Sequence, residues 1–103
     1  MTLKEIKELL DKTGLPVAYR KFKKPASLPF ICYLETGSHN FSADGKVYSE
    51  AKRIDIELYT ENKEPEAEEK LNRVLDSADI FYERYEDYID SEKMYQITYE
   101  IEV

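Results

Sequence analysis

The sequence predicts an α+β fold, in which two helices pack on one face of a mostly antiparallel sheet in the order α-β-β-β-α-β-β. Two segments carry apolar residues three and four positions apart, which is the spacing of one face of a helix. Two others, in the middle and at the end of the chain, alternate apolar with polar residues, as a half-buried strand does. Elements with one apolar face must cover each other, so we expect two packed layers in one domain, residues 1–103.

The middle of the chain holds a strand that leads directly into a helix. In the predicted strand, Lys46–Thr60, the residues Ile54, Ile56 and Leu58 share one face. Pro65 suits the first turn of the helix that follows. We expect this strand face to be buried against the apolar face of the helix, which consists of Ala67, Leu71, Val74, Leu75 and Ala78.

The first helix is predicted at the N-terminus, where Thr2 and Glu5 fit a capping box and Gly14 is expected to end the helix as its C′ residue. Because this segment is charged and amphipathic, no signal peptide is expected. Two strands should follow the helix, Val17–Phe22 and Leu28–Thr36.

A polar loop, Gly37–Gly45, separates the second predicted strand from the third. The loop has a second interpretation, because Asp44-Gly45 is a favourable hairpin turn. If Phe41–Ser42 pairs with Val47–Tyr48 across that turn, the loop is a projecting β-arm. In either case we expect a bulge in the third strand near Ser49–Lys52.

The last third of the chain should add two strands. Ile80–Tyr85 is predicted as the fourth strand and Glu86–Lys93 as an acidic turn. The fifth strand, Met94–Val103, alternates cleanly, and we expect its apolar face to consist of Tyr95, Ile97, Tyr99, Ile101 and Val103.

The net charge of −7 argues against nonspecific binding to nucleic acids or anionic membranes. No apolar run approaches the about 20 residues that a membrane-spanning helix needs. The charge is unevenly distributed. Basic residues outnumber acidic residues in the first 25 positions, and acidic residues outnumber basic residues in the last 43. A complementary head and tail would produce this distribution, and so would an ordinary solvated surface.

Groups that could carry chemistry are sparse, and we expect no catalytic residue, no cofactor and no metal ion. His39 is the only histidine and lies in the polar loop, whereas catalytic and metal sites need several convergent groups. Cys32, the only cysteine, lies in the apolar run PFICYL and is expected to be a buried small hydrophobe. The carboxylate runs lack the spacing of a calcium loop. We interpret them as a solvated acidic face, with a cation site as the alternative.

Nine tyrosines are a large share of this chain. Strand propensity and packing in the sheet explain them in one way. Enrichment of tyrosine in subunit interfaces explains them in another, and both explanations stay open. A stacking surface for single-stranded nucleic acid is the weakest explanation, because it needs a basic groove.

The layout of these segments resembles the small tail terminator, or tail-completion, proteins of long-tailed phages and prophages. The resemblance covers nearly the whole chain. It is carried by the helix LKEIKELLDKTG, the strands LPFICYLET and RIDIELYT, the helix EPEAEEKLNRVLDSA and the final strand pair rich in tyrosine and isoleucine. In that family, such domains form rings, often hexamers, at the head-proximal end of the tail tube. The ring stops tube growth and joins the neck, and DNA passes through it.

The resemblance therefore implies a structural, non-enzymatic virion protein that is made in the host cytoplasm. It would form a homo-oligomeric ring, contact the tail tube protein and a neck or head-completion protein, meet DNA only in passage and touch no membrane. One rival is a small cytoplasmic module that binds or inhibits another protein, and a second is an enzyme that uses carboxylates and a cation. Charge and loop position suggest a subunit or partner interface at Arg20, Lys21, Lys23, Lys24, His39, Phe41, Glu83, Tyr85, Glu86 and Asp87.

Overall fold

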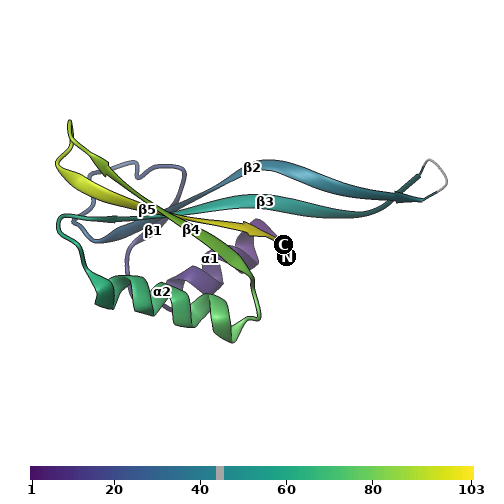
Figure 1. The fold of residues 1–103 in the computed structure, drawn as a ribbon, viewed down its shortest axis with the longest axis horizontal. Coiled ribbons are helices and arrows are strands. Elements are labelled where there is room, and N and C mark those ends of the chain that lie inside the picture. The colour runs from purple at the N-terminus through teal and green to yellow at the C-terminus, as the bar shows by residue number, and fades with distance from the viewer. Residues whose placement is uncertain (44–45) are drawn as a thin grey trace.

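The computed structural model describes the backbone of residues 1–43 and 46–103, and the side chains of residues 1–40 and 50–103. Its elements follow one another in the predicted order (Figure 1). They are α1 (Leu3–Asp11), β1 (Val17–Tyr19), β2 (Phe30–Ala43), β3 (Lys46–Thr60), α2 (Pro65–Ser77), β4 (Tyr82–Ile89) and β5 (Met94–Glu102).

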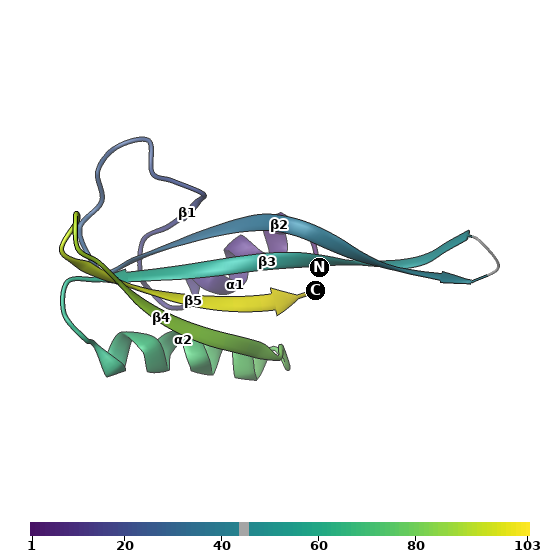
Figure 2. The same cartoon turned by 45° about the horizontal axis from the view of Figure 1, so that its top comes forward.

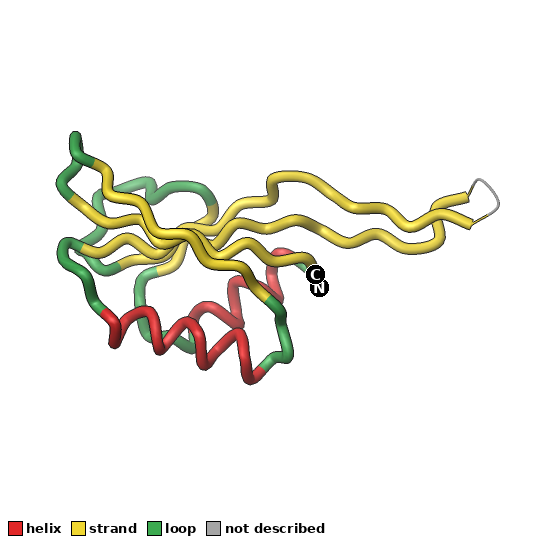
Figure 3. The backbone as a smooth tube through the Cα atoms, in the orientation of Figure 1, coloured by secondary structure: helices red, strands yellow, loops and turns green. Residues whose placement is uncertain are grey.

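The strands form one sheet in the order β1-β2-β3-β5-β4. β1 runs parallel to β2, and every other neighbouring pair is antiparallel. Both helices lie on the same side of the sheet, as the red coils in Figure 3 show. The predicted α+β class is therefore confirmed, and one face of the sheet is left without a covering layer.

The covered face forms the core, as the alternation in β3 predicts. Ile54, Ile56 and Leu58 are fully buried, and so are Leu71 and Leu75 of α2. All five belong to one apolar cluster, which confirms that this strand and helix bury each other. The same cluster includes residues from α1, β2 and β5, among them Ile6, Leu10, Ile31, Ile97 and Tyr99.

The two ends of α1 follow local rules. The amide of Glu5 donates to Thr2 Oγ1 (3.1 Å) and the amide of Thr2 donates to Glu5 Oε1 (2.9 Å), which confirms the capping box. The helix stops earlier than expected, at Asp11, with Lys12 as its C-cap. Gly14 lies just beyond with φ of 78°, a left-handed conformation that glycine adopts without strain.

Several predicted strand boundaries were wrong, among them the start of β2, which is Phe30 instead of Leu28. β1 ends at Tyr19 instead of Phe22, because Arg20 has φ of 63° and the amide of Lys21 turns back to the carbonyl of Tyr19. β4 begins at Tyr82 instead of Ile80, because the amide of Ile80 donates to the carbonyl of Leu75 and closes the end of α2.

The expected acidic turn is also shorter than predicted. Glu86–Ile89 continues β4, with Glu86 opposite Ile97 and Ile89 opposite Met94. Only residues 90–93 connect β4 to β5, and Lys93 turns the chain with φ of 52°. The prediction failed because both faces of this edge strand are largely polar, so no apolar alternation marks it.

The segment expected as a loop or a β-arm is an arm. β2 continues to Ala43 and pairs with β3 out to Lys46, far past the last β3–β5 pair at Arg53. The pairing of Ser42 with Val47 is as predicted, and the register shift near Tyr48 lies just before the expected bulge. A further shift lies between Glu35 and Gly37, where the arm leaves the body. The arm lengthens the molecule to 50 × 29 × 24 Å (Figures 1 and 2).

Candidate functional site

The open face of the sheet, defined here as the strand side chains that point away from α1 and α2, is unusually acidic. Side chains alternate along each strand, so in β3, β4 and β5 every second residue, next to those that face the helices, points to this face. Arg53 lies among them at one end. The carboxylates of the open face are Asp55, Glu57, Glu83, Asp87, Glu100 and Glu102.

Three of these carboxylates form a row across neighbouring strands. Glu100 of β5 lies directly opposite Asp55 of β3 on one side and Glu83 of β4 on the other. Like charges in such cross-strand pairs repel each other. Partial burial and the charge of Glu100 raise the pKa of Asp55. The row is therefore a place where the fold holds negative charges together without matching cations.

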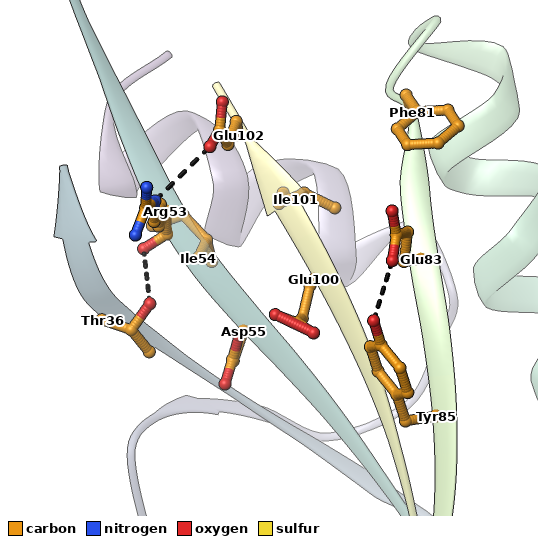
Figure 4. A pocket seen from close by; sticks show the side chains of 10 residues that line it. All are labelled: Thr36, Arg53, Ile54, Asp55, Phe81, Glu83, Tyr85, Glu100, Ile101 and Glu102. Carbon is orange, nitrogen blue, oxygen red and sulfur yellow. Dashed lines mark hydrogen bonds and ion pairs between the residues drawn. The ribbon is translucent and has the colours of Figure 1, made fainter. Parts of the chain in front are cut away.

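A hollow of about 570 Å³ lies over this row, at the end of the sheet where β5 stops (Figure 4). Arg53 and Glu102 line one side, with Arg53 Nε 3.4 Å from Glu102 Oε1. Phe81 and Tyr85 line the other side. We call this feature the acidic hollow.

The aromatic side of the acidic hollow is open to solvent. Phe81 is 79% exposed and Tyr85 is 49% exposed. The Tyr85 hydroxyl donates to Glu83 Oε2 at 2.8 Å, and this hydrogen bond is the main reason that the pKa of Tyr85 rises to about 12. Two aromatic rings beside carboxylates present apolar area and negative charge together, a combination that suits a cationic partner.

The opposite end of the same face carries a positive surface. We call residues 20–24, in the connection between β1 and β2, the basic loop; its charged members are Arg20, Lys21, Lys23 and Lys24. All four charged side chains are exposed. The connection lies on the side of the sheet away from α2 (Figures 1 and 2), and its residues line a second hollow of about 460 Å³ over Phe30, Cys32 and Tyr59.

Aromatic packing holds the basic loop in place. The rings of Phe22 and Phe30 meet edge to face with centroids 5.1 Å apart, and Phe30 lies 5.2 Å from Tyr59. The loop therefore presents its cations from an anchored base. Cys32 is 4% exposed beneath it, which confirms the expected buried position, and burial raises the pKa of its thiol.

Charged side chains on the helix side of β4 form ion pairs within the subunit. Glu68 of α2 is only 4% exposed, and its carboxylate lies between two cations: Lys63 Nζ at 2.6 Å and Arg84 Nη1 at 3.2 Å. Lys63 also contacts Glu86 Oε1 at 2.6 Å. This cluster ties the start of α2 to the outer strand. Sequence inspection missed it, because the four residues come from three separate segments.

The structure places the sequence-predicted interface residues in several surroundings. The basic set stays together, and Glu83, Tyr85 and Asp87 share the open face, but Glu86 points to the helix side. His39 lies on the arm, with Nδ1 3.7 Å from Glu102 Oε2. The side chain of Phe41 lies outside the described residues.

The described residues carry neither a candidate metal site nor a candidate membrane-spanning helix. Among the described residues, no group of three or more His, Cys, Asp or Glu side chains could hold a metal ion. No helix in that part of the chain is long and apolar enough to cross a membrane. The surface with the most distinctive physical character is the open face, with its acidic hollow at one end and the basic loop at the other.

Comparison with known proteins gives a structural likeness. No protein-family model and no curated protein sequence matches the chain. Among solved structures, it is similar to a chain of the virion of a native gene transfer agent (GTA) particle, with a TM-score of 0.68 and 13% sequence identity. The alignment covers 97% of this chain and 85% of that chain. At this identity the likeness shows a shared fold.

Proposed function

We propose that this protein is a structural component of a phage-like virion: a ring-forming tail terminator, or tail-completion factor, at the junction of head and tail. The observation that carries the proposal is the shared fold with a GTA virion chain over 97% of this chain. The resemblance of the segment layout to tail terminator proteins points in the same direction.

The surface of the molecule supports a role in assembly. A ring needs a heterologous contact, in which one face of each subunit meets a different face of the next. The acidic hollow and the basic loop are two such unlike surfaces on one chain. The arm extends away from the body and offers a further contact to a neighbouring subunit or to the next protein of the tail.

The overall charge also fits the proposed location. A net charge of −7 disfavours adhesion to the DNA backbone, so DNA could slide through a ring of such subunits. The protein partners would be the tail tube protein on one side of the ring and a neck or head-completion protein on the other. No catalytic step is needed, because the ring acts by contact.

Two experiments test this function. Sedimentation and negative-stain electron microscopy of the purified protein at high concentration should show closed rings, with about six subunits as in the family it resembles. Removing the gene from the cells that produce the particles should leave heads and tails unjoined or tails of irregular length. Monomers at every concentration, together with normal particles after gene removal, would exclude the proposed role.

The acidic hollow favours a second candidate function, a small module that binds a basic partner protein. Exposed Phe81 and Tyr85 beside several carboxylates would suit a lysine- or arginine-rich segment of such a partner. A binding module of this kind would remain a monomer or dimer at concentrations where a ring protein associates. The sedimentation experiment therefore separates the two functions.

A further inference from the structure

We propose that the acidic hollow of one subunit receives the basic loop of the next copy of the same chain. This inference rests on the proposed function, because it names the contact that would close the ring. It starts from the charges that the fold leaves uncompensated on the open face.

Four carboxylates line the acidic hollow, against one cation, Arg53. Asp55, Glu100 and Glu83 lie side by side across three strands, and Arg53 is placed at the edge of the row, against Glu102. A cation delivered from outside would relieve the repulsion within the row. The helix side of β4 shows the contrast, since there Glu68 has two cations within reach.

The basic loop has the opposite imbalance, because it lacks negative charge. Residues 20–30 contain four cations and no carboxylate. Within the described part of the chain, none of Lys21, Lys23 and Lys24 forms an ion pair. Arg20 acts only at a distance, where its charge partly offsets the raised pKa of Glu57.

The two surfaces cannot meet within one subunit. Phe22 anchors the basic loop to Phe30 and Tyr59, while the acidic hollow lies at the level of Arg53. From Asp55 and Arg53 to Tyr59 the distance is four to six residue steps of β3, which is about 13–20 Å along the strand. The attraction must therefore act between copies. In a head-to-tail arrangement of copies, each contact leaves a free hollow and a free loop, so copies add until a ring closes.

The aromatic side of the acidic hollow explains why a lysine-rich loop fits better than a free cation. Lysine carries a long apolar stem below its ammonium group. The stem can lie against Phe81 while the charge reaches Glu83 or Glu100. Lysine above an aromatic face also gains a cation–π attraction. The contact then buries apolar area in addition to pairing charges. Exposed ion pairs alone contribute little to association.

Charge reversal with a mixing step tests the contact. The first variant, Lys21→Glu with Lys23→Glu and Lys24→Glu, makes the loop acidic; the second, Glu83→Lys with Glu100→Lys, makes the hollow basic. In each variant alone, loop and hollow repel, and we expect the dissociation constant from sedimentation equilibrium to rise about tenfold or more. In an equimolar mixture, each loop meets an oppositely charged hollow on the other variant, so association should return in alternating assemblies.

A matched control separates this contact from a change of net charge. Lys4→Glu with Lys12→Glu and Lys70→Glu alters the charge by the same amount as the loop variant, at exposed positions on or next to the helices and away from the open face. It should associate like the wild type. Circular dichroism of every variant checks folding, and recovery in the mixture is itself evidence that both variants are folded.

The outcomes distinguish this inference from the proposed function. Multimers that neither reversal weakens would overturn the loop–hollow contact and leave the ring function standing. A wild-type protein that stays monomeric at all concentrations would overturn both. Two variants that do not associate alone but associate when mixed would establish the contact. Electron micrographs of closed rings or open filaments would then decide whether the contact belongs to a terminator ring.

Discussion

The two faces of the sheet use the same alternating strands for opposite purposes. On the covered face, residues such as Ile56 and Tyr99 are fully buried against α1 and α2. On the open face, Asp55 and Glu100 stand in direct opposition although they repel. The covered face stabilises the fold, whereas the open face holds a row of carboxylates that repel one another. A function that involves another molecule is therefore expected at the open face.

The buried charge on the covered side shows the same contrast between the two faces. Glu68 is nearly as buried as the apolar core, but Lys63 and Arg84 compensate its charge. The buried carboxylate of Glu68 is thus paired with cations of the same subunit. The row of Asp55, Glu100 and Glu83 lacks them, so the same chain treats charges differently on its two faces.

The largest effect is expected from breaking the covered face. Leu71→Ala or Leu75→Ala removes a fully buried side chain and leaves a cavity, so the free energy of unfolding should fall by about 2–5 kcal/mol. Urea denaturation followed by circular dichroism measures it. Lys70→Ala, an exposed neighbour on the same helix, is the control and should stay within about 0.5 kcal/mol. A small effect of the leucine variants would mean that the strand–helix register described here is wrong.

A smaller loss is expected from the charge cluster on the same side. Glu68→Gln removes the negative charge between Lys63 and Arg84, and the free energy of unfolding should fall by about 1–3 kcal/mol, as for other hydrogen bonds to charged groups. Glu69→Gln is the matched control, because Glu69 pairs with Arg73 on the exposed helix surface, where the contribution is about 0–1 kcal/mol. Equal losses in the two variants would show that burial of Glu68 adds nothing.

The open face should respond in the opposite direction. Glu100→Gln removes one repulsive member of the row, so the subunit should become more stable by about 0.2–1 kcal/mol at neutral pH. The gain should shrink in acid. The folded pKa of Asp55 is raised, so the folded state takes up this proton before the unfolded state does. The destabilisation from Asp55 is therefore full above its folded pKa and is lost as the pH falls towards its unfolded pKa.

Denaturation curves of the wild type and Glu100→Gln across that pH range provide the measurement. Glu92→Gln, in the exposed β4–β5 turn, changes the net charge equally and should give no gain. If Glu100→Gln destabilises the subunit at neutral pH, Glu100 makes a favourable contact and the view of the open face as self-repelling is wrong.

Patterns of burial explain which parts of the fold could be predicted from the sequence. Ile54, Ile56 and Leu58, and likewise the apolar face of β5, alternate because one face is buried, so both strands could be found. The capping box at Thr2 depends on residues three positions apart and was equally visible. The start of β4 could not be read locally, because Ile80 resembles a strand residue but closes α2 through a hydrogen bond to Leu75.

The candidate site depends on longer-range facts. Each member of the carboxylate row could be assigned to a strand face by alternation, but the row exists only because β5 lies between β3 and β4. The grouping of Glu86 with Glu83 failed for a local reason, since adjacent odd and even positions of a strand point to opposite faces. The position of the basic loop over Phe30 and Tyr59 follows from aromatic packing that no spacing rule reveals.

The smallest effect on stability is expected from the arm. Beyond Lys52, whose backbone exchanges two hydrogen bonds with Val103, the two strands of the arm pair only with each other, and no described arm side chain belongs to the core. A two-stranded hairpin of this kind is marginally stable alone, so the body cannot depend on it. Replacing residues 39–51, between the paired residues Ser38 and Lys52, with an Asn-Gly turn should change the free energy of unfolding by no more than about 0.5 kcal/mol.

Assembly should respond strongly to the same deletion, because the arm reaches beyond the covered and the open face alike (Figure 1). Sedimentation of the armless protein and electron microscopy of particles made with it separate two kinds of contact. Loss of multimers would mean that the arm packs on the neighbouring copy and supports the loop–hollow contact. Intact multimers with unjoined heads and tails would mean that the arm contacts a different virion protein. Normal particles would leave the arm without an assembly role and confine recognition to the open face.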